Sequence, residues 1–223
     1  MTITVAVLNE AKLPDSTIAI YVRELQNAIA LLKTKWTLPD VTVTTVKSQG
    51  AWEVSITNLN RRTGADGWHN VSPTGLAYAY ITPGTLAYPF GTYRAGALRR
   101  LIGKTWFPIK PEYLRSGCLT VLIHETLEML VDPALKTVST TPDKLGHNWL
   151  IEVCSTAVFG TYFHHQDPVT KQDCVLPNFA FPSAFDLNGK ALFDYLGVLK
   201  APFTTTPKSY PYWVDKSGKL IKV

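Results

Sequence analysis

Four side chains suited to metal chemistry lie within one short stretch, "LIHETLEMLVDP": His124, Glu125, Glu128 and Asp132. On a helix, His124, Glu128 and Asp132 share one face at spacings of i, i+4 and i+8, and Glu125 flanks them. Carboxylates one turn apart repel each other, and this stretch contains no Lys or Arg to offset the repulsion. A bound cation would remove it. The alternative is an amphipathic helix with an acidic, solvated side.

The pattern H-E-x-x-E predicts a metal site, because it has the ligand spacing of an H-E-x-x-H helix with Glu128 in place of the second histidine. We expect His124 and Glu128 to bind the ion and Glu125 to act as general base toward a water. As third ligand we expect Glu152, in "NWLIEVCS", on a second helix or strand after a loop. Zinc accepts carboxylate oxygen. One histidine with two carboxylates is a harder set than zinc usually takes, so Mn²⁺, Fe²⁺ and Ca²⁺ also stay open.

Asp132 and the remaining histidines are predicted either to support the metal site or to have no part in it. Asp132 is expected to support the ligands without binding the ion. His147, in "KLGHNW", is a candidate ligand or transition-state donor, and its alternative is a surface histidine. His69 is expected to be structural. Adjacent residues on a regular element cannot both face one site, so at most one of His164 and His165 is functional.

Composition favours one globular domain over residues 1–223. The chain is 46% hydrophobic and 17% charged, which argues for a packed core and against disorder. The net charge of +5 is spread thinly. Its longest basic cluster predicts a solvated helix face, not a nucleic-acid surface. That cluster consists of Arg94, Arg99, Arg100 and Lys104.

The sequence predicts neither a signal peptide nor a membrane-spanning segment. The opening "MTITVAVLNEAKL" has no basic start and meets an acid at Glu10, so we predict no signal peptide. No uncharged apolar run reaches membrane-spanning length, so we expect a soluble protein with no membrane partner. The three cysteines form no disulfide framework. Cys154 and Cys174 could pair in an oxidising medium, but free core thiols are favoured.

The elements that must position the site follow from periodicity and turn signals, and they predict an α+β fold. Strands are expected at 2–9, 41–47, 52–58 and 75–84, with helices at 16–34 and 94–102. The central site helix is expected at 116–133, opened by Ser116 and ended by Pro133. Residues 1–110 would form the N-terminal sheet and helix. Residues 134–223 would form an irregular, aromatic-rich extension that closes with a hairpin at 212–223.

Four motifs in the C-terminal half carry a resemblance. "HETLEMLVDP" resembles the active-site helix of the zincin-like metallopeptidase fold. More narrowly, it resembles a group of phage- and prophage-encoded proteins with the pattern H-E-x-x-E-M-L-x-D-P, then E-V-C-D, then F-x-x-P-x-x-F, then a Pro-Phe segment with a downstream Tyr. This chain matches with 124–133, with "EVCS" at 152–155, with "FAFPSAF" at 179–185 and with "APFTTTPKSYPYW" at 201–213.

The resemblance implies a zincin-like core, in which a strand, a helix and further strands precede the site helix. Residues 75–84 would be the edge strand, to which an extended peptide adds by β-augmentation. The implied activity is a metal-dependent, peptidase-type hydrolase, phage-encoded and virion-associated, located in the virion or the host cytoplasm. Its partners would be peptides, neighbouring virion subunits or further copies of the chain. The alternative is a catalytically inactive capsid or tail component, because Ser155 stands where the pattern has Asp.

Overall fold

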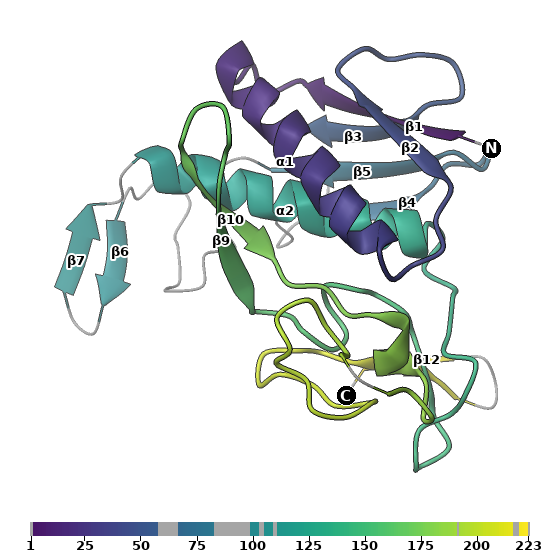
Figure 1. Ribbon diagram of the computed structural model, residues 1–223. Coiled ribbons are helices and arrows are strands. Elements are labelled where there is room, and N and C mark those ends of the chain that lie inside the picture. Colours follow the sequence, from purple (N-terminus) through teal and green to yellow (C-terminus); the bar gives the residue numbers. More distant parts are fainter. Residues whose placement is uncertain are drawn as a thin grey trace.

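The protein is an α+β structure with a mixed sheet and two long helices, followed by a largely irregular C-terminal part (Figure 1). The computed structural model describes residues 2–57, 67–82, 99–102, 105–108, 111–190, 192–215 and 219–222. Strands rich in buried apolar residues build the sheet, and two helices cover it. The α+β fold class predicted from the sequence is therefore confirmed.

The sheet has five strands in the order β2-β1-β3-β5-β4. They are β1 (Thr2–Asn9), β2 (Asp40–Thr44), β3 (Trp52–Ile56), β4 (Gly67–Val71) and β5 (Ala77–Ile81). The first four in space run parallel, and β4 pairs antiparallel with β5. The predicted edge strand at 75–84 was therefore placed wrongly. It corresponds to β5, which lies between β3 and β4, and the outer strand is β4.

Helices α1 (Asp15–Lys33) and α2 (Pro111–Val131) pack against each other on the sheet (Figure 1). The first was predicted closely. The second begins at Pro111, five residues before the predicted start at Ser116, because proline suits the first helical position, where its missing N–H is not needed. It ends just before Pro133, as predicted. The helix crosses β3, β5 and β4, which brings its polar side close to the outer strand.

The predicted helix at 94–102 was wrong where it can be compared. Residues 99–102 form strand β6 (Arg99–Ile102), which pairs antiparallel with β7 (Thr105–Pro108). The backbone pairing of these two strands takes the place of the predicted helical turn. Residues 94–98 lie outside the described residues.

The C-terminal part contains short strands joined by turns, and it closes with the predicted hairpin. Strands β9 (Tyr162–Gln166) and β10 (Asp173–Pro177) form an antiparallel hairpin against α2. Strand β11 (Tyr212–Val214) pairs with both β12 (Leu220–Lys222) and β8 (Asn148–Trp149). A 3₁₀ helix spans Pro182–Phe185. The last hairpin therefore packs on a strand of its own chain.

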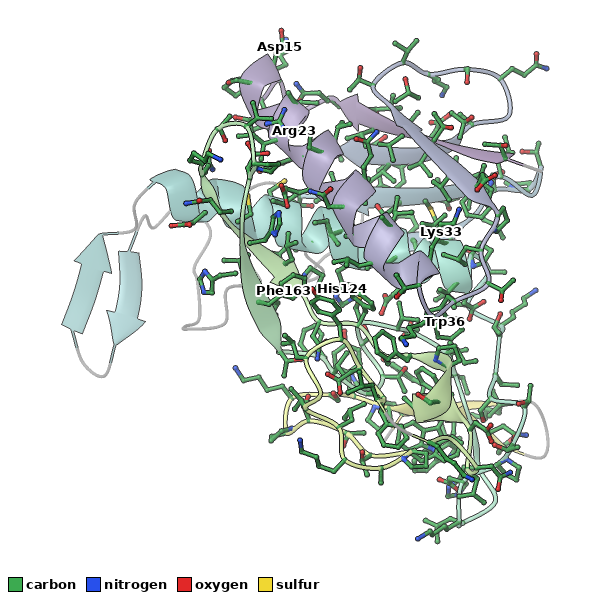
Figure 2. All side chains as sticks on the ribbon, viewed as in Figure 1. Asp15, Arg23, Lys33, Trp36, His124 and Phe163 are labelled. Carbon is green, nitrogen blue, oxygen red and sulfur yellow. The ribbon has the colours of Figure 1, made fainter. Side chains whose placement is uncertain are left out.

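One continuous hydrophobic core joins the sheet, the helices and the C-terminal part. Phe179, Phe181 and Phe185 are buried in it. The Trp36 indole, after α1, donates a hydrogen bond to the Ala180 carbonyl oxygen at 2.9 Å, which ties the helical layer to this part (Figure 2). All three cysteines are buried and free, so the prediction of core thiols is confirmed.

Candidate functional site

The polar side of α2 faces a cavity between the sheet and the C-terminal part. Toward the core, Ile123 and Leu127 are fully buried and fix the rotation of the helix. This rotation places His124, Glu125 and Glu128 on the cavity wall. Both glutamates are nonetheless buried, with 8% and 3% of their surfaces exposed. Buried carboxylates need hydrogen-bond or charge partners, and the neighbouring segments supply them.

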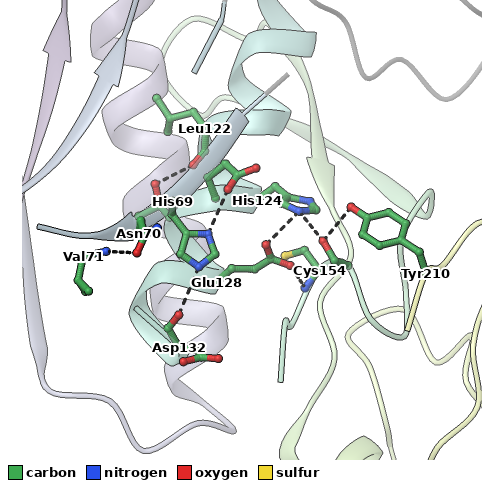
Figure 3. Close-up of polar contacts among 12 residues, drawn as sticks. His69, Asn70, Val71, Leu122, His124, Glu128, Asp132, Cys154 and Tyr210 are labelled. Carbon is green, nitrogen blue, oxygen red and sulfur yellow. Dashed lines mark hydrogen bonds and ion pairs between the residues drawn. The ribbon is translucent and has the colours of Figure 1, made fainter. Parts of the chain in front are cut away.

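His124 lies at the centre of a chain of polar contacts (Figure 3). Its Nε2 atom is 3.2 Å from Glu128 Oε2 and 2.9 Å from the Ser155 hydroxyl. Ser155 is 3.2 Å from the hydroxyl of Tyr210, in the C-terminal part. The Cys154 backbone N–H donates to the other Glu128 oxygen at 3.1 Å. Helix α2 and the two later segments thus meet at one histidine.

The electrostatics of this group favour a proton or a metal ion between His124 and Glu128. Burial opposes charge on His124, but the Glu128 carboxylate beside it raises the pKa of His124 to about 9. Burial likewise opposes charge on Glu128, yet the His124 imidazole lowers the pKa of Glu128. Burial and then the Glu128 charge raise the pKa of Glu152 to about 8. The Glu152 carboxyl group therefore keeps its proton at neutral pH beside the Glu128 carboxylate.

A second contact group connects the outer strand to the same helix. His69, on β4, is buried, and its Nδ1 atom is 3.1 Å from Glu125 Oε2. Its Nε2 atom is 3.2 Å from the backbone carbonyl oxygen of Asp132. Gly67, two residues earlier on the strand, passes so close to α2 that an added Cβ would be 2.8 Å from Glu125 Cγ.

Two sets of donor atoms could hold a metal ion among the described residues. His124, Glu128 and Cys154 form one, and His69, Glu125 and Glu128 form the other, with the atoms of each set within 4.8 Å of one another. Two ligand atoms about 2.1 Å from a tetrahedral zinc ion stand about 3.4 Å apart. The 3.2 Å between His124 Nε2 and Glu128 Oε2 fits that spacing. This pair is therefore suited to a divalent ion.

Of the three remaining predicted site residues, Glu152 lines the cavity, Asp132 contacts a cavity residue through its backbone, and His147 lies outside the cavity lining. Glu152 lies in the irregular stretch between β8 and the turns that begin at Val153, and not on a helix or strand. Its carboxylate belongs to neither donor set. The Asp132 carboxylate accepts hydrogen bonds from the backbone N–H groups of Lys136 and Thr137, so Asp132 touches the site through its carbonyl oxygen. His147 contacts Asp143 and stacks on a tryptophan, outside the residues that line the cavity.

The cavity itself has a volume of about 280 Å³. Strand β4 and helix α2 form one wall, and Tyr210 and Tyr212 from the C-terminal part form another. A larger hollow of about 620 Å³ lies beside Trp68, Tyr78 and Tyr80, but neither donor set is there. The smaller cavity is therefore the candidate site, because the titratable groups converge on it.

Sequence reasoning missed His69 and did not single out Tyr210. The strand that carries His69 was not predicted, so no pattern aligned this histidine with α2. Tyr210 lies in the segment "SYPYW", where the resemblance expected a tyrosine but did not choose between Tyr210 and Tyr212. A histidine two residues after a glycine, ahead of a predicted strand, was the only local signal.

Comparisons of this chain with protein-family models, with curated proteins and with solved structures found no match. Within the described part of the chain, neither helix has the length and apolar character needed to cross a membrane.

Proposed function

We propose that this protein is a zincin-like, metal-dependent hydrolase of peptide bonds. The observation that carries the proposal is the convergence of His124, Glu125, Glu128 and Glu152 on one cavity. Three of them come from one stretch of α2, in the H-E-x-x-E pattern, and the fourth comes from a separate segment. A structural acidic helix has no need of this convergence, whereas a hydrolytic metal site depends on it.

The position of the sheet supports the same proposal. The resemblance implies an edge strand beside the site helix, and β4 is the outer strand of the described sheet and adjoins α2. Its residues Gly67, Trp68 and His69 line the cavity. An extended peptide that pairs with β4 would therefore pass along the cavity, with its backbone bound by β-augmentation.

Each residue has a role in this proposal. His124 and Glu128 would hold the ion, which is zinc or another divalent metal. Glu152 lines the same cavity outside both donor sets, so it would complete the coordination after a change of rotamer. When bound, such an ion polarises a carbonyl group and acidifies a water molecule. Glu125 would accept the proton of the attacking water and pass it to the leaving amine. The Tyr210 hydroxyl, held by Ser155, is placed to donate a hydrogen bond into the cavity.

The test combines metal analysis with hydrolysis. The purified protein should bind close to one divalent ion and cleave unstructured peptides, with activity lost on chelation and restored by metal. Glu125→Gln should keep the metal and the melting temperature but lose the cleavage. His164→Ala is the matched control, because His164 is exposed on β9, and it should behave like the wild type. A wild-type protein that binds metal without hydrolysing any peptide would refute the proposed activity.

One observation favours a second candidate, a catalytically inactive zincin-like component of a phage particle. Ser155 supplies a hydroxyl where the resemblance expects a carboxylate, and His124, Ser155 and Glu128 already satisfy one another through hydrogen bonds. In this case the partners would be neighbouring subunits of the particle. Ser155→Asp separates the candidates. An inactive scaffold should bind metal poorly and gain affinity with this substitution, whereas an active enzyme should bind metal without it.

A further inference from the structure

We propose that His69 is a positioning residue that fixes the Glu125 carboxylate in its orientation at the cavity. The inference rests on the proposed function for its catalytic consequence, but the contact itself can be tested without any activity. It assigns a role to the outer strand beyond peptide binding, since β4 would hold the general base of the reaction.

The tautomer of His69 follows from its partners. A backbone carbonyl oxygen can only accept a hydrogen bond, so the Nε2 atom facing Asp132 must carry a hydrogen. The imidazole is therefore anchored to the end of α2, and Nδ1 is directed at Glu125 Oε2, 3.1 Å away. One proton lies in that contact, either on the imidazole or on the carboxyl group. In both forms the hydrogen bond holds the carboxyl group in place.

Burial makes this contact effective. The His69 side chain is 3% exposed and that of Glu125 is 10% exposed. A hydrogen bond in such a low-dielectric place is stronger than one in water, because little solvent reaches its atoms. Burial opposes charge on His69, but the hydrogen bond to Glu125 outweighs it together with the nearby carboxylates and raises the pKa of His69.

Gly67 restricts the same carboxylate from the same strand. Residues 67 and 69 lie on one face of β4, because side chains alternate along a strand. An added Cβ at Gly67 would lie 3.0 Å from Glu125 Oε1, while His69 contacts Oε2. The glutamate therefore fits between a close backbone and a hydrogen-bonding ring, which limits its rotamers. Restriction of this kind is what a reacting base needs, since a small misplacement costs much of the rate.

Matched substitutions separate positioning from simple structural support. His69→Asn keeps an amide donor near the Nδ1 position, toward Glu125, and loses the contact with Asp132. His69→Gln keeps a donor near the Nε2 position, toward Asp132, and loses the contact with Glu125. His69→Ala loses both contacts.

We expect kcat to fall about tenfold to a hundredfold in His69→Ala and His69→Gln, with KM changed little. His69→Asn should recover most of kcat even if its melting temperature falls. A purely structural role predicts that kcat follows the melting temperature in all three variants. That result, or equal kcat values in His69→Asn and His69→Gln, would overturn the proposal.

Nitrogen NMR of the histidine rings tests the contact without any hydrolysis. The chain has five histidines, so His69→Ala identifies the signal of His69. Its Nε2 should carry a proton, and its Nδ1 resonance should shift in Glu125→Gln, while the His164 signal stays in place. An Nδ1 resonance insensitive to Glu125→Gln overturns the proposal. If the wild type hydrolyses no peptide but the resonance shifts, the hydrolase proposal fails and the positioning of Glu125 by His69 is supported.

Discussion

Gly67→Ala should damage the candidate site although it replaces none of the site's polar or charged side chains. The new Cβ would lie 2.6 Å from Val121 Cγ1 and 2.8 Å from Glu125 Cγ. Carbon atoms in contact prefer separations of about 3.5–4.0 Å. Strand β4 or helix α2 must therefore move by about 1 Å. Val121 is packed in the core, and Glu125 is held by His69, so neither side chain can easily change its rotamer to avoid the new Cβ.

The magnitude follows from known costs of overpacking. Forcing an extra methyl group into a packed interior costs about 1–3 kcal/mol. For a chain of this size, that loss corresponds to a fall in Tm of about 2–12 °C. A displacement of about 1 Å at Glu125 should also reduce hydrolysis by about a hundredfold, which is the scale for a misplaced catalytic group. Metal affinity should change less, since the atoms nearest to the added Cβ belong to Val121 and Glu125 and not to His124 or Glu128.

Thermal unfolding and peptide hydrolysis measure the two effects. Gly75→Ala is the matched control, because nothing lies within 4 Å of a Cβ there and Gly75 has a φ of +82°. It should cost about 1 kcal/mol through backbone strain alone and leave hydrolysis unchanged. Adding Val121→Ala to Gly67→Ala should remove one of the two clashes, so the pair should be less harmful than the sum of its single substitutions. A Gly67→Ala protein with unchanged Tm and activity would show that β4 does not constrain Glu125.

Three further outcomes follow from the described residues. Glu24 is fully buried, and the His165 imidazole lies 3.4 Å from its Oε2 atom, but the cost of burial outweighs this contact, so Glu24→Met should raise the free energy of unfolding at pH 7 by about 1–3 kcal/mol in chemical denaturation. Burial raises the pKa of Glu24, so folding disfavours its charged form, and the gain from Glu24→Met should shrink as the pH falls toward 4. Asp132→Ala should cost about 1–3 kcal/mol, because the Lys136 and Thr137 N–H groups lose their acceptor; Asp132→Asn, which keeps an acceptor oxygen, should cost less. In the metal-free protein, the pKa of His124 is raised from 6.5 to about 9 and that of Glu152 from 4.5 to about 8, so Tm should fall as the pH rises from about 6.5 to about 9. Zinc should abolish this fall, because binding displaces both protons, and a Tm independent of pH without metal would contradict it.

The sequence was sufficient to predict the elements with strong local signals. Helix α1 has a clear apolar period after Pro14, and Pro133 marks the end of α2. The H-E-x-x-E spacing was enough to place His124, Glu125 and Glu128 on one cavity wall, since three neighbouring positions of one helix need no tertiary information.

The rest depends on pairing between distant segments. Strand β4 is a five-residue strand with a glycine and polar residues, and only its antiparallel pairing with β5 identifies it. Without β4, the contact between His69 and Glu125 could not be foreseen. Glu152 was predicted from sequence spacing alone, and the irregular stretch after β8 decides where its carboxylate lies. The contact between Ser155 and Tyr210 spans 55 residues, beyond the reach of any local pattern.

The participation of Tyr210 has a consequence for biosynthesis. A chain grows from its N-terminus at about 5–20 residues per second, so Tyr210 is made about 4–17 s after His124. During that interval α2 and β4 can already pack, but the wall formed by Tyr210 and Tyr212 does not yet exist. The nascent protein therefore has the histidine and the carboxylates without the aromatic wall that shapes the cavity around a substrate. If the proposed hydrolysis depends on this wall, a growing chain cannot carry it out before Tyr212 has been made.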